Sequence, residues 1–464
     1  MSTTPTNLEE LIKAKGGPIE HLSATGAGGY VFPVVPPEQT SWQCEQLAWM
    51  NDCVLMDQTH HMDDIYITGP DAVQLLSDTG INSFKNFKPG MAKQHIACNH
   101  EGYLIGDNIL AWLNDGRIMS AGLGPGNNWI AYQAQKGGYD VEITHSPRTS
   151  SLWDGSPLTR KYWRYQIQGP KAWALIEKLN GASVADIKFF HMTTINIAGR
   201  QVEALRHGMA GAPGLEIWGP IEEQAEILAT ILEAGAEFGL RQVGNRAYST
   251  SAVESGWLGA LFPAIFSGEE MEDFRKSLPP FTIEAFFQLG GSFSSGRIED
   301  YYKTPFDAGY DPFIKFDHDF IGRAALEKMV EAKGDQRKKV TLEWFPEDAE
   351  RVMGSLWRDG PKYKVLDLPV SLYAFGQNDR VEKDGSLVGL STIVATTINS
   401  QGLISLASVD RSLELDQEVE IVWGEEPGVY DNIRVEPHEQ TRVRAIVRPA
   451  PYSKEAREGL RAKK

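Results

Sequence analysis

The chain has 464 residues, of which 42% are apolar and 23% charged, values typical of a globular protein of about three domains. The net charge of −17 argues against a nucleic acid or an anionic membrane surface as a partner, and no apolar run is long enough to span a bilayer. Three scattered cysteines exclude a disulfide framework, and the polar N-terminus carries no export segment, so we expect a cytoplasmic protein.

Residues 55–71, with the sequence LMDQTHHMDDIYITGPD, contain two adjacent histidines close to several aspartates. The run is typical of a strand that ends at a Gly-Pro turn. Successive side chains of a strand point to opposite faces, so His60 and His61 cannot both reach one ion. We therefore predict no metal site, with one histidine facing the core and the other a cleft. The aspartates are expected to be solvated or to form turns.

A weak internal repeat predicts two similar lobes. Residues 65–76 (IYITGPDAVQLL) and 165–176 (YQIQGPKAWALI) share the pattern Ile-x-Gly-Pro-x-Ala-x-x-Leu, with the same offset of one hundred residues throughout. Each indicates a strand, a Gly-Pro corner and a helix with apolar residues at helical spacing. Residues 222–239 then form an amphipathic helix that ends at Gly239.

From Arg337 onward the sequence changes to short β-rich runs separated by turn residues, the pattern of a small barrel or sandwich. We therefore expect three domains. These are a first α+β lobe over residues 1–155, a second α+β lobe over residues 156–335, and a β-rich domain over residues 336–464.

Familiar catalytic motifs are missing from the sequence. The glycine-rich stretches 26–29 and 122–128 lack the spacing of phosphate-binding or dinucleotide-binding loops and are expected to be turns. No Gly-x-Ser-x-Gly elbow offers a nucleophilic serine, and the cysteines have no electropositive neighbours in sequence. The protein is therefore not expected to supply a nucleophile of its own.

Several stretches together resemble the folate-dependent aminomethyltransferase superfamily, which includes the T-protein of glycine cleavage. The similar stretches occur in the family's order and span nearly the whole chain: residues 55–77, 102–112, 211–220, 315–328 and 385–410. The resemblance implies an α+β fold of three domains in a cloverleaf, in which two related lobes form the folate site and a β-barrel follows.

Within that superfamily the chain is most similar to the tetrahydrofolate-dependent aryl O-demethylases of lignin-monomer catabolism, in residues 163–179, 205–220 and 244–257. In the last of these stretches Tyr248 and Ala252 stand where aminomethyltransferases carry two arginines. Loss of both argues against glycine cleavage. A tyrosine at this position implies a general acid that protonates the phenolate leaving group, since phenols have similar pKa values near 10.

The resemblance also implies roles for residues that bind folate. Glu216 is expected to accept hydrogen bonds from the pterin ring, because a carboxylate can take two parallel N–H donors. Trp257 offers a flat face to the pterin or to the arene. Asp107 matches one of the two aspartates that handle an amine in aminomethyltransferases, whereas Gly106 has lost the other. Tetrahydrofolate is thus the expected methyl acceptor.

The aromatic substrate is expected to contact the segment that carries the histidines. By resemblance, His61 and Gln58 line the arene pocket, with a catalytic role for His61, and His60 gives packing or support. Strand alternation would place Gln58 on the face of His60, which conflicts with that assignment. Which histidine faces the pocket therefore stays open.

Four further positions bear on the choice of substrate: Tyr30, Phe32, Ala121 and Leu123. Vanillate-type relatives have Tyr-Val-Tyr-Pro where this chain has Tyr30-Val-Phe-Pro, and Val-Gly-Arg where it has Ala121-Gly-Leu. Less bulk beside the ring favours syringate, with its second ortho methoxy group. The missing arginine leaves recognition of the ring carboxylate to another group.

Alternatives from other classes remain. The substrate could be vanillate or 3-O-methylgallate, or the enzyme could demethylate a sulfonium or a methylamine. A non-catalytic folate-binding assembly factor on the same fold is a further alternative, but the Lys-Gly-Cys-Tyr-x-Gly-Gln-Glu segment of those relatives is absent. The sequence leaves the oligomeric state undetermined.

Overall fold

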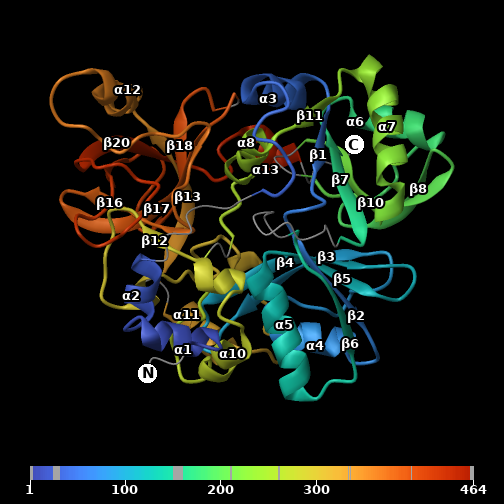
Figure 1. The fold of residues 1–464 in the computed structure, drawn as a ribbon, viewed down its shortest axis with the longest axis horizontal. Helices are drawn as coiled ribbons and strands as arrows, with labels where there is room; N and C mark the ends of the chain where they lie inside the picture. The colour runs from blue at the N-terminus through green and yellow to red at the C-terminus, as the bar shows by residue number, and fades with distance from the viewer. Residues whose placement is uncertain are drawn as a thin grey trace.

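The computed structural model describes residues 4–24, 32–149, 160–208, 212–259, 262–332, 334, 336–398 and 400–459. Figure 1 shows two α+β lobes on the right and a β-barrel on the left, with the N-terminal helices below the barrel. The expected fold class is confirmed. The expected domain limits stay predictions, because residues 155, 156 and 335 lie outside the described ranges.

The first sheet is antiparallel and has five strands. In spatial order they are β3 (Ala92–Cys98), β4 (Leu104–Trp112), β5 (Ile118–Gly122), β2 (Asp63–Thr68) and β6 (Glu142–Ser146). Helices α4 (Ala72–Thr79) and α5 (Gly124–Gly137) pack on one face. Alternate apolar residues of β2, such as Ile65 and Ile67, point to that face and bury against Leu75 of α4.

The second sheet has six strands. In spatial order they are β11 (Arg241–Val243), β1 (Val54–Asp57), β7 (Tyr162–Gln168), β10 (Gly214–Pro220), β9 (Arg200–Leu205) and β8 (Met192–Ile197). Its outer face is covered by α6 (Ala172–Asn180) and α7 (Gln224–Gly235), with Ile227 and Ile231 of α7 fully buried. The amphipathic helix is therefore confirmed: α7 ends at Gly235, a 3₁₀ turn over Ala236–Phe238 follows, and Gly239 in the left-handed conformation stops that turn.

The predicted repeat is also confirmed. β2 and α4 are joined by Gly69-Pro70, and β7 and α6 by Gly169-Pro170. Both glycines have positive φ angles, +116° and +129°. A Cβ on Gly169 would lie 2.5 Å from the carbonyl oxygen of Asp52, so the backbone that leads into β1 leaves no room for a side chain there.

The strand β1 precedes the first lobe in sequence but lies in the second sheet. It pairs with β7 on one side, antiparallel, and with β11 on the other, parallel. The next strand, β2, belongs to the first sheet. Residues 58–62 therefore cross from one sheet to the other, and the predicted continuous strand through the two histidines is wrong.

The remaining helices and short strands surround these sheets. Helices α1, α2 and α10 share an apolar cluster with residues 262–302, which contains Trp129 and Phe274. The helices are α1 (Leu8–Ala14), α2 (Pro18–Ser23), α3 (Trp42–Asn51), α8 (Asn245–Ser249), α9 (Ser251–Glu254), α10 (Glu272–Ser277), α11 (Arg323–Glu331), α12 (Pro346–Gly354) and α13 (Lys454–Gly459). The short 3₁₀ turns are η2 (Ile221–Glu223), η3 (Ala236–Phe238), η4 (Ile283–Phe286), η5 (Ile298–Tyr301), η6 (Asp311–Phe313) and η7 (Ser355–Trp357).

The C-terminal domain is a closed barrel of six strands, since β17 pairs with both β16 and β18. In order around the barrel the strands are β17 (Ser386–Thr396), β16 (Asp379–Lys383), β19 (Glu418–Trp423), β20 (Thr441–Arg448), β13 (Arg337–Trp344) and β18 (Leu403–Asp410). A short strand, β14 (Val370–Ser371), pairs with β17 of the barrel, whereas β12 (Leu289–Gly290) and β15 (Gly376–Gln377) form a separate parallel pair. Of the two predicted architectures, barrel and sandwich, the barrel is observed.

Across the described parts of the chain, no helix combines the length and the apolar character needed to cross a membrane.

The Gly169 corner gives a test of the fold. Replacing Gly169 with Ala should lower the free energy of unfolding by about 3 kcal/mol, because the methyl group collides with the Asp52 carbonyl and the φ angle is unfavourable. The matched control is Gly181→Ala at the other end of α6. There φ is +72°, and an added Cβ would have no atom within 4 Å apart from those of its chain neighbours. That variant should lose only about 1 kcal/mol in chemical denaturation. Equal losses would contradict the collision.

Candidate functional site

Tyr248 is the centre of a cluster at the point where the chain crosses between the sheets. Its hydroxyl lies 3.1 Å from Gln58 Nε2, which donates to it, and 3.1 Å from His61 Nε2. Gln58 Nε2 also donates to Gln166 Oε1 of β7 at 3.0 Å. Tyr248 lies on α8 and is 8% exposed. This helix therefore brings a buried phenol into contact with residues 58–62, which we call the crossing segment.

The aromatic rings of Phe32, His61 and Tyr248 pack against one another at this hydroxyl. The ring centroids of Phe32 and His61 lie 4.7 Å apart, those of Phe32 and Tyr248 5.2 Å, and those of His61 and Tyr248 5.0 Å. The last two pairs meet edge to face. Burial, followed by the charge of Arg148, lowers the pKa of His61 well below its ordinary value, so the imidazole is neutral at neutral pH.

The crossing segment explains why Gln58 and His61 face the same way. Residues 58–62 form a turn between β1 and β2, so the two-residue alternation of a strand does not apply to them. The conflict raised by the strand prediction therefore disappears. His60 points elsewhere, with its Nδ1 3.0 Å from the hydroxyl of Thr149, and Thr149 N–H donates to the His60 carbonyl.

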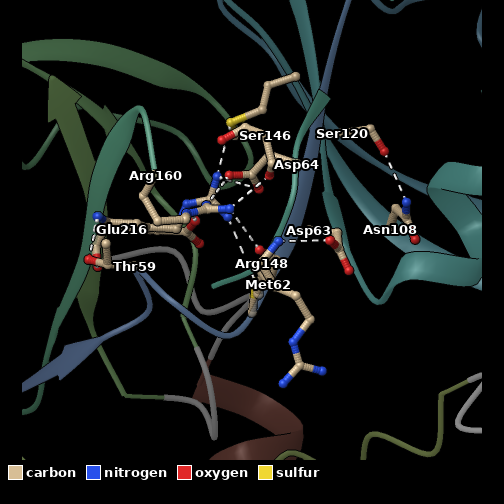
Figure 2. A network of polar contacts seen from close by, with 12 residues as sticks. Thr59, Met62, Asp63, Asp64, Asn108, Ser120, Ser146, Arg148, Arg160 and Glu216 are labelled. Carbon is tan, nitrogen blue, oxygen red and sulfur yellow. Dashed lines mark hydrogen bonds and ion pairs between the residues drawn. The ribbon is translucent and has the colours of Figure 1, made fainter. Parts of the chain in front are cut away.

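A buried group of charges lies next to this cluster and joins the two sheets (Figure 2). Asp64 of β2 accepts from Arg160 Nη2 at 2.5 Å and lies 3.1 Å from Arg164 Nη2 of β7. Arg164 Nε is 3.4 Å from Glu216 Oε1 of β10. Asp64 is only 2% exposed, so the expectation that the aspartates are solvated or form turns is wrong for Asp64. Sequence reasoning missed this group.

The alternation of β7 carries the signal that could have found it. Trp163, Tyr165 and Ile167 are buried in the core under α6 and α7. The intervening Arg164, Gln166 and Gln168 therefore point to the opposite face and are also buried. A strand with an apolar face and a buried polar face indicates a polar site on the second face. On β7, Arg164 contacts Asp64 and Glu216, and Gln166 accepts from Gln58.

Glu216 lies at this polar site, with Oε1 near Arg164 and Oε2 3.3 Å from His207 Nδ1. Burial raises the pKa of its carboxyl, but the hydrogen bond from His207 and the charge of Arg164 outweigh burial and lower it overall. Glu216 is therefore ionised at neutral pH. A carboxylate has about four lone-pair positions, so Glu216 keeps acceptor capacity for paired N–H donors.

Asp107 and Trp257, both predicted at the folate site, contact each other. Trp257 Nε1 donates to Asp107 Oδ2 at 2.7 Å, and the Tyr310 hydroxyl donates to the same oxygen. Gly106, next to Asp107, lies against α5, where an added Cβ would come within 2.6 Å of the Gly126 Cα. This close approach gives a physical reason why no second aspartate stands at position 106.

The other predicted residues lie at different places. Ala121 is buried on β5 beside Asp64, in an apolar cluster with Tyr66 and Trp218 that joins the two sheets. Leu123 immediately precedes α5 and packs against the cluster that contains Trp129. Tyr30 lies outside the described residues. Among the residues that the structure describes, no three His, Cys, Asp or Glu side chains are placed to hold a metal ion.

Comparison with known proteins identifies close relatives. The family described as the GCVT N-terminal domain matches residues 23–260. Syringate O-demethylase of Sphingobium sp. (strain SYK-6) is 41% identical over 454 residues, which cover 98% of this chain and 97% of that protein. Sesamin methylene transferase of Sinomonas sp. (strain No.22) is 28% identical over 87% of this chain and 89% of its own length.

A solved structure shares the fold. Aminomethyltransferase T of the glycine cleavage system from Bartonella henselae superposes with a TM-score of 0.61 at 16% identity, over 96% of this chain and 97% of that one. The expected T-protein-like architecture is thereby confirmed.

The buried charges predict a large effect of removing one of them. Asp64→Asn leaves Arg160 and Arg164 without their shared carboxylate, and we expect a loss of about 3–5 kcal/mol in the free energy of unfolding. Chemical denaturation followed by tryptophan fluorescence measures this loss.

The control is Asp115→Asn, which removes the exposed partner of Arg117. A surface pair contributes about 1 kcal/mol or less, so the control should denature almost like the wild type. If Asp64→Asn were no more harmful than Asp115→Asn, the charges would not be what joins the two sheets.

Proposed function

The chain belongs to the GCVT family, and we propose that it transfers the methyl group of a methoxylated aromatic acid to N5 of tetrahydrofolate. The products are a hydroxylated arene and 5-methyltetrahydrofolate. The observation that carries the proposal is the Tyr248 hydroxyl, which contacts Gln58 and His61, with the Phe32 ring packed against both His61 and Tyr248.

The chemistry requires an acid at the ether oxygen. The methyl carbon leaves the oxygen as a bond forms to N5, and the bonding electron pair stays on the aryl oxygen. Tyr248 gives its proton to that oxygen, and the proton released from N5 restores the tyrosine, so charge and protons balance. General acid catalysis of this kind contributes roughly 10²–10⁴-fold to the rate.

The contacts of Tyr248 suit this role. Gln58 Nε2 donates to the phenolic oxygen, and His61 in its Nε2–H tautomer is a second donor to it. Two donors stabilise the tyrosinate that remains after the proton has moved, while the Tyr248 proton points to the substrate. His61 stays neutral because burial lowers its pKa, so it donates without changing charge.

The residues proposed for tetrahydrofolate fit its pterin. Glu216 is ionised and keeps acceptor capacity, and the pterin ring offers adjacent N–H donors that match a carboxylate. The indole of Trp257 is fixed in orientation by its bond to Asp107 and is only partly buried. We therefore assign Glu216 to the pterin and Trp257 to stacking, with Asp107 orienting Trp257 instead of contacting an amine.

Syringate is the proposed substrate. The relative named syringate O-demethylase supports this choice, and so does Phe32, whose ring packs against both His61 and Tyr248. A phenylalanine at this position leaves an apolar wall beside the reacting oxygen, where a second methoxy group fits better than it would beside a hydroxyl.

The activity assay uses purified protein with tetrahydrofolate and syringate, vanillate or 3-O-methylgallate. Tyr248→Phe should lower kcat by about 10²–10⁴-fold on syringate while the protein stays folded, because only the acid is lost. The control Tyr139→Phe removes a hydroxyl that bonds Asp78 on α4 and should keep full activity. Absence of turnover with every methoxyarene would refute the proposed function, and an active Tyr248→Phe variant would refute the acid.

Phe32→Tyr tests the preference between substrates. The added hydroxyl enters the wall formed with His61 and Tyr248, so kcat/KM for syringate should fall about 10-fold relative to vanillate. The ratio of the two kcat/KM values is the measurement. An unchanged ratio would show that Phe32 does not set the preference.

A further inference from the structure

Gln166 of β7 is a neighbour of two residues assigned to the reaction. In the second sheet it stands directly opposite Glu216 of β10 on one side and Met56 of β1 on the other. Residues directly opposite each other in an antiparallel pair have Cβ atoms about 5 Å apart and share one face of the sheet. The Gln166 side chain is fully buried on that face and contacts Gln58. It therefore lies beside both the proposed pterin carboxylate and a partner of the proposed acid.

The main chain fixes the orientation of the Gln166 amide. Its Nε2 donates to the carbonyl oxygen of His207 at 3.4 Å, in the connection between β9 and β10. A carbonyl oxygen only accepts, so turning this amide round would place two oxygens against each other. Gln166 Oε1 is therefore directed to Gln58, whose Nε2 donates to it at 3.0 Å.

The same reasoning fixes the orientation of Gln58. Because Gln166 offers it an oxygen, Gln58 presents its nitrogen there, and the same nitrogen donates to the Tyr248 hydroxyl at 3.1 Å. If the Gln58 amide were turned round, its Oε1 would face the oxygen of Gln166 and the phenol. Gln58 would then accept the phenolic proton instead of donating to the phenolic oxygen.

We propose that Gln166 is a positioning residue that keeps the donor of the Gln58 amide directed to Tyr248, and this rests on the proposed function. A donor stabilises the tyrosinate that remains after proton transfer. An acceptor would instead stabilise the protonated phenol and hold its proton away from the ether oxygen. The fixed acceptor at His207 thus determines, through two amides, that Tyr248 receives a hydrogen bond.

The main test is Gln166→Met, which removes both hydrogen bonds of the amide and keeps a side chain of similar length. Gln58 then loses the partner that orients it and turns its oxygen to Tyr248. The value of kcat on syringate should fall about 10- to 100-fold, the effect of losing one hydrogen bond to a charged group. KM for syringate should change little, because Gln166 does not contact the substrate.

Fluorine NMR with 3-fluorotyrosine in place of Tyr248 measures the effect on the acid directly. The pH at which this residue ionises should be about one unit higher in Gln166→Met than in the wild-type background, because the phenolate has lost a donor. A lower kcat without this shift would indicate a purely structural role and would overturn the inference.

The matched control is Gln168→Met. Gln168 lies on the same face of β7, is equally buried and donates its Nε2 to another backbone carbonyl, that of Ala212, at 3.2 Å. Its replacement should lower the free energy of unfolding to a similar degree, but residue 248 should ionise at the wild-type pH. Equal shifts in the two variants would contradict a specific role of Gln166.

Gln166→Glu distinguishes hydrogen bonding from packing. A carboxyl buried beside the ionised Glu216 stays protonated at neutral pH, so it offers an acceptor to Gln58 and a donor to the His207 carbonyl, as the amide does. This variant should therefore keep most of the wild-type kcat at neutral pH. If Gln166 acted only through packing, Gln166→Met would be the milder of the two substitutions.

A double-mutant cycle tests whether Gln166 acts through Gln58. In a Gln58→Met background, Gln166→Met should cause no further loss of kcat, because the amide that it orients is already absent. Additive losses would overturn the inference. If Gln166→Met does not fold, Gln166→Asn replaces it, since an amide one methylene shorter does not reach Gln58.

The fluorine titration separates the two proposals because it needs neither substrate nor turnover. A shift in Gln166→Met that is absent in Gln168→Met supports the positioning role even if no methoxyarene is demethylated, in which case only the proposed function fails. Turnover by the wild type without a shift in Gln166→Met overturns only the inference. Absence of both turnover and shift overturns both.

Discussion

The buried ion pair between Asp64 and Arg164 fixes the two sheets against each other. Its partners lie on β2 and β7, the two strands that are equivalent in the repeat, and Arg160 and Glu216 complete the charges. Charges removed from water are costly unless each is paired, so this region tolerates only one relative position of the strands. The apolar contacts of Tyr66 and Ala121 with Trp218 lie beside it and exclude water.

That fixed position determines the geometry of the reacting side chains. The crossing segment is anchored at one end by β1 in the second sheet and at the other by β2 in the first. Only five residues separate the two anchors, so the turn cannot adopt many conformations. Gln58 and His61 are therefore held toward Tyr248 by the positions of two sheets and need no local helix or strand to orient them.

The sequence predicted those features that depend on local pattern. The repeated Gly-Pro corners, the amphipathic helix with its stop at Gly239 after a final 3₁₀ turn, and the β-rich C-terminal domain follow from spacing and turn residues within short windows. Resemblance to the family identified Tyr248, His61, Gln58 and Phe32, which the structure brings together.

What could not be predicted depends on contacts between distant residues. Asp64 and Arg164 are far apart in sequence, and nothing near Asp64 shows that a cation will cover it. The sequence also does not show that β1 belongs to the second sheet. A strand joins the sheet whose edge strands have unpaired backbone hydrogen-bonding groups beside it, and these strands, β7 and β11, are far from β1 in sequence. The strand prediction through His60 and His61 failed for this reason, since it assumed that adjacent apolar runs share one sheet.

The position of β1 has a consequence for how the protein is made. Val54 pairs with Gln168 and with Arg241, so both sets of its hydrogen bonds wait for residues that leave the ribosome much later. Domains usually fold as they emerge, N-terminal first. Here the second sheet, which holds β1, stays incomplete until β11 has been synthesised. The turn that carries Gln58 and His61 is thus ordered only when both lobes exist, and a chain interrupted after the first lobe has no formed reaction centre.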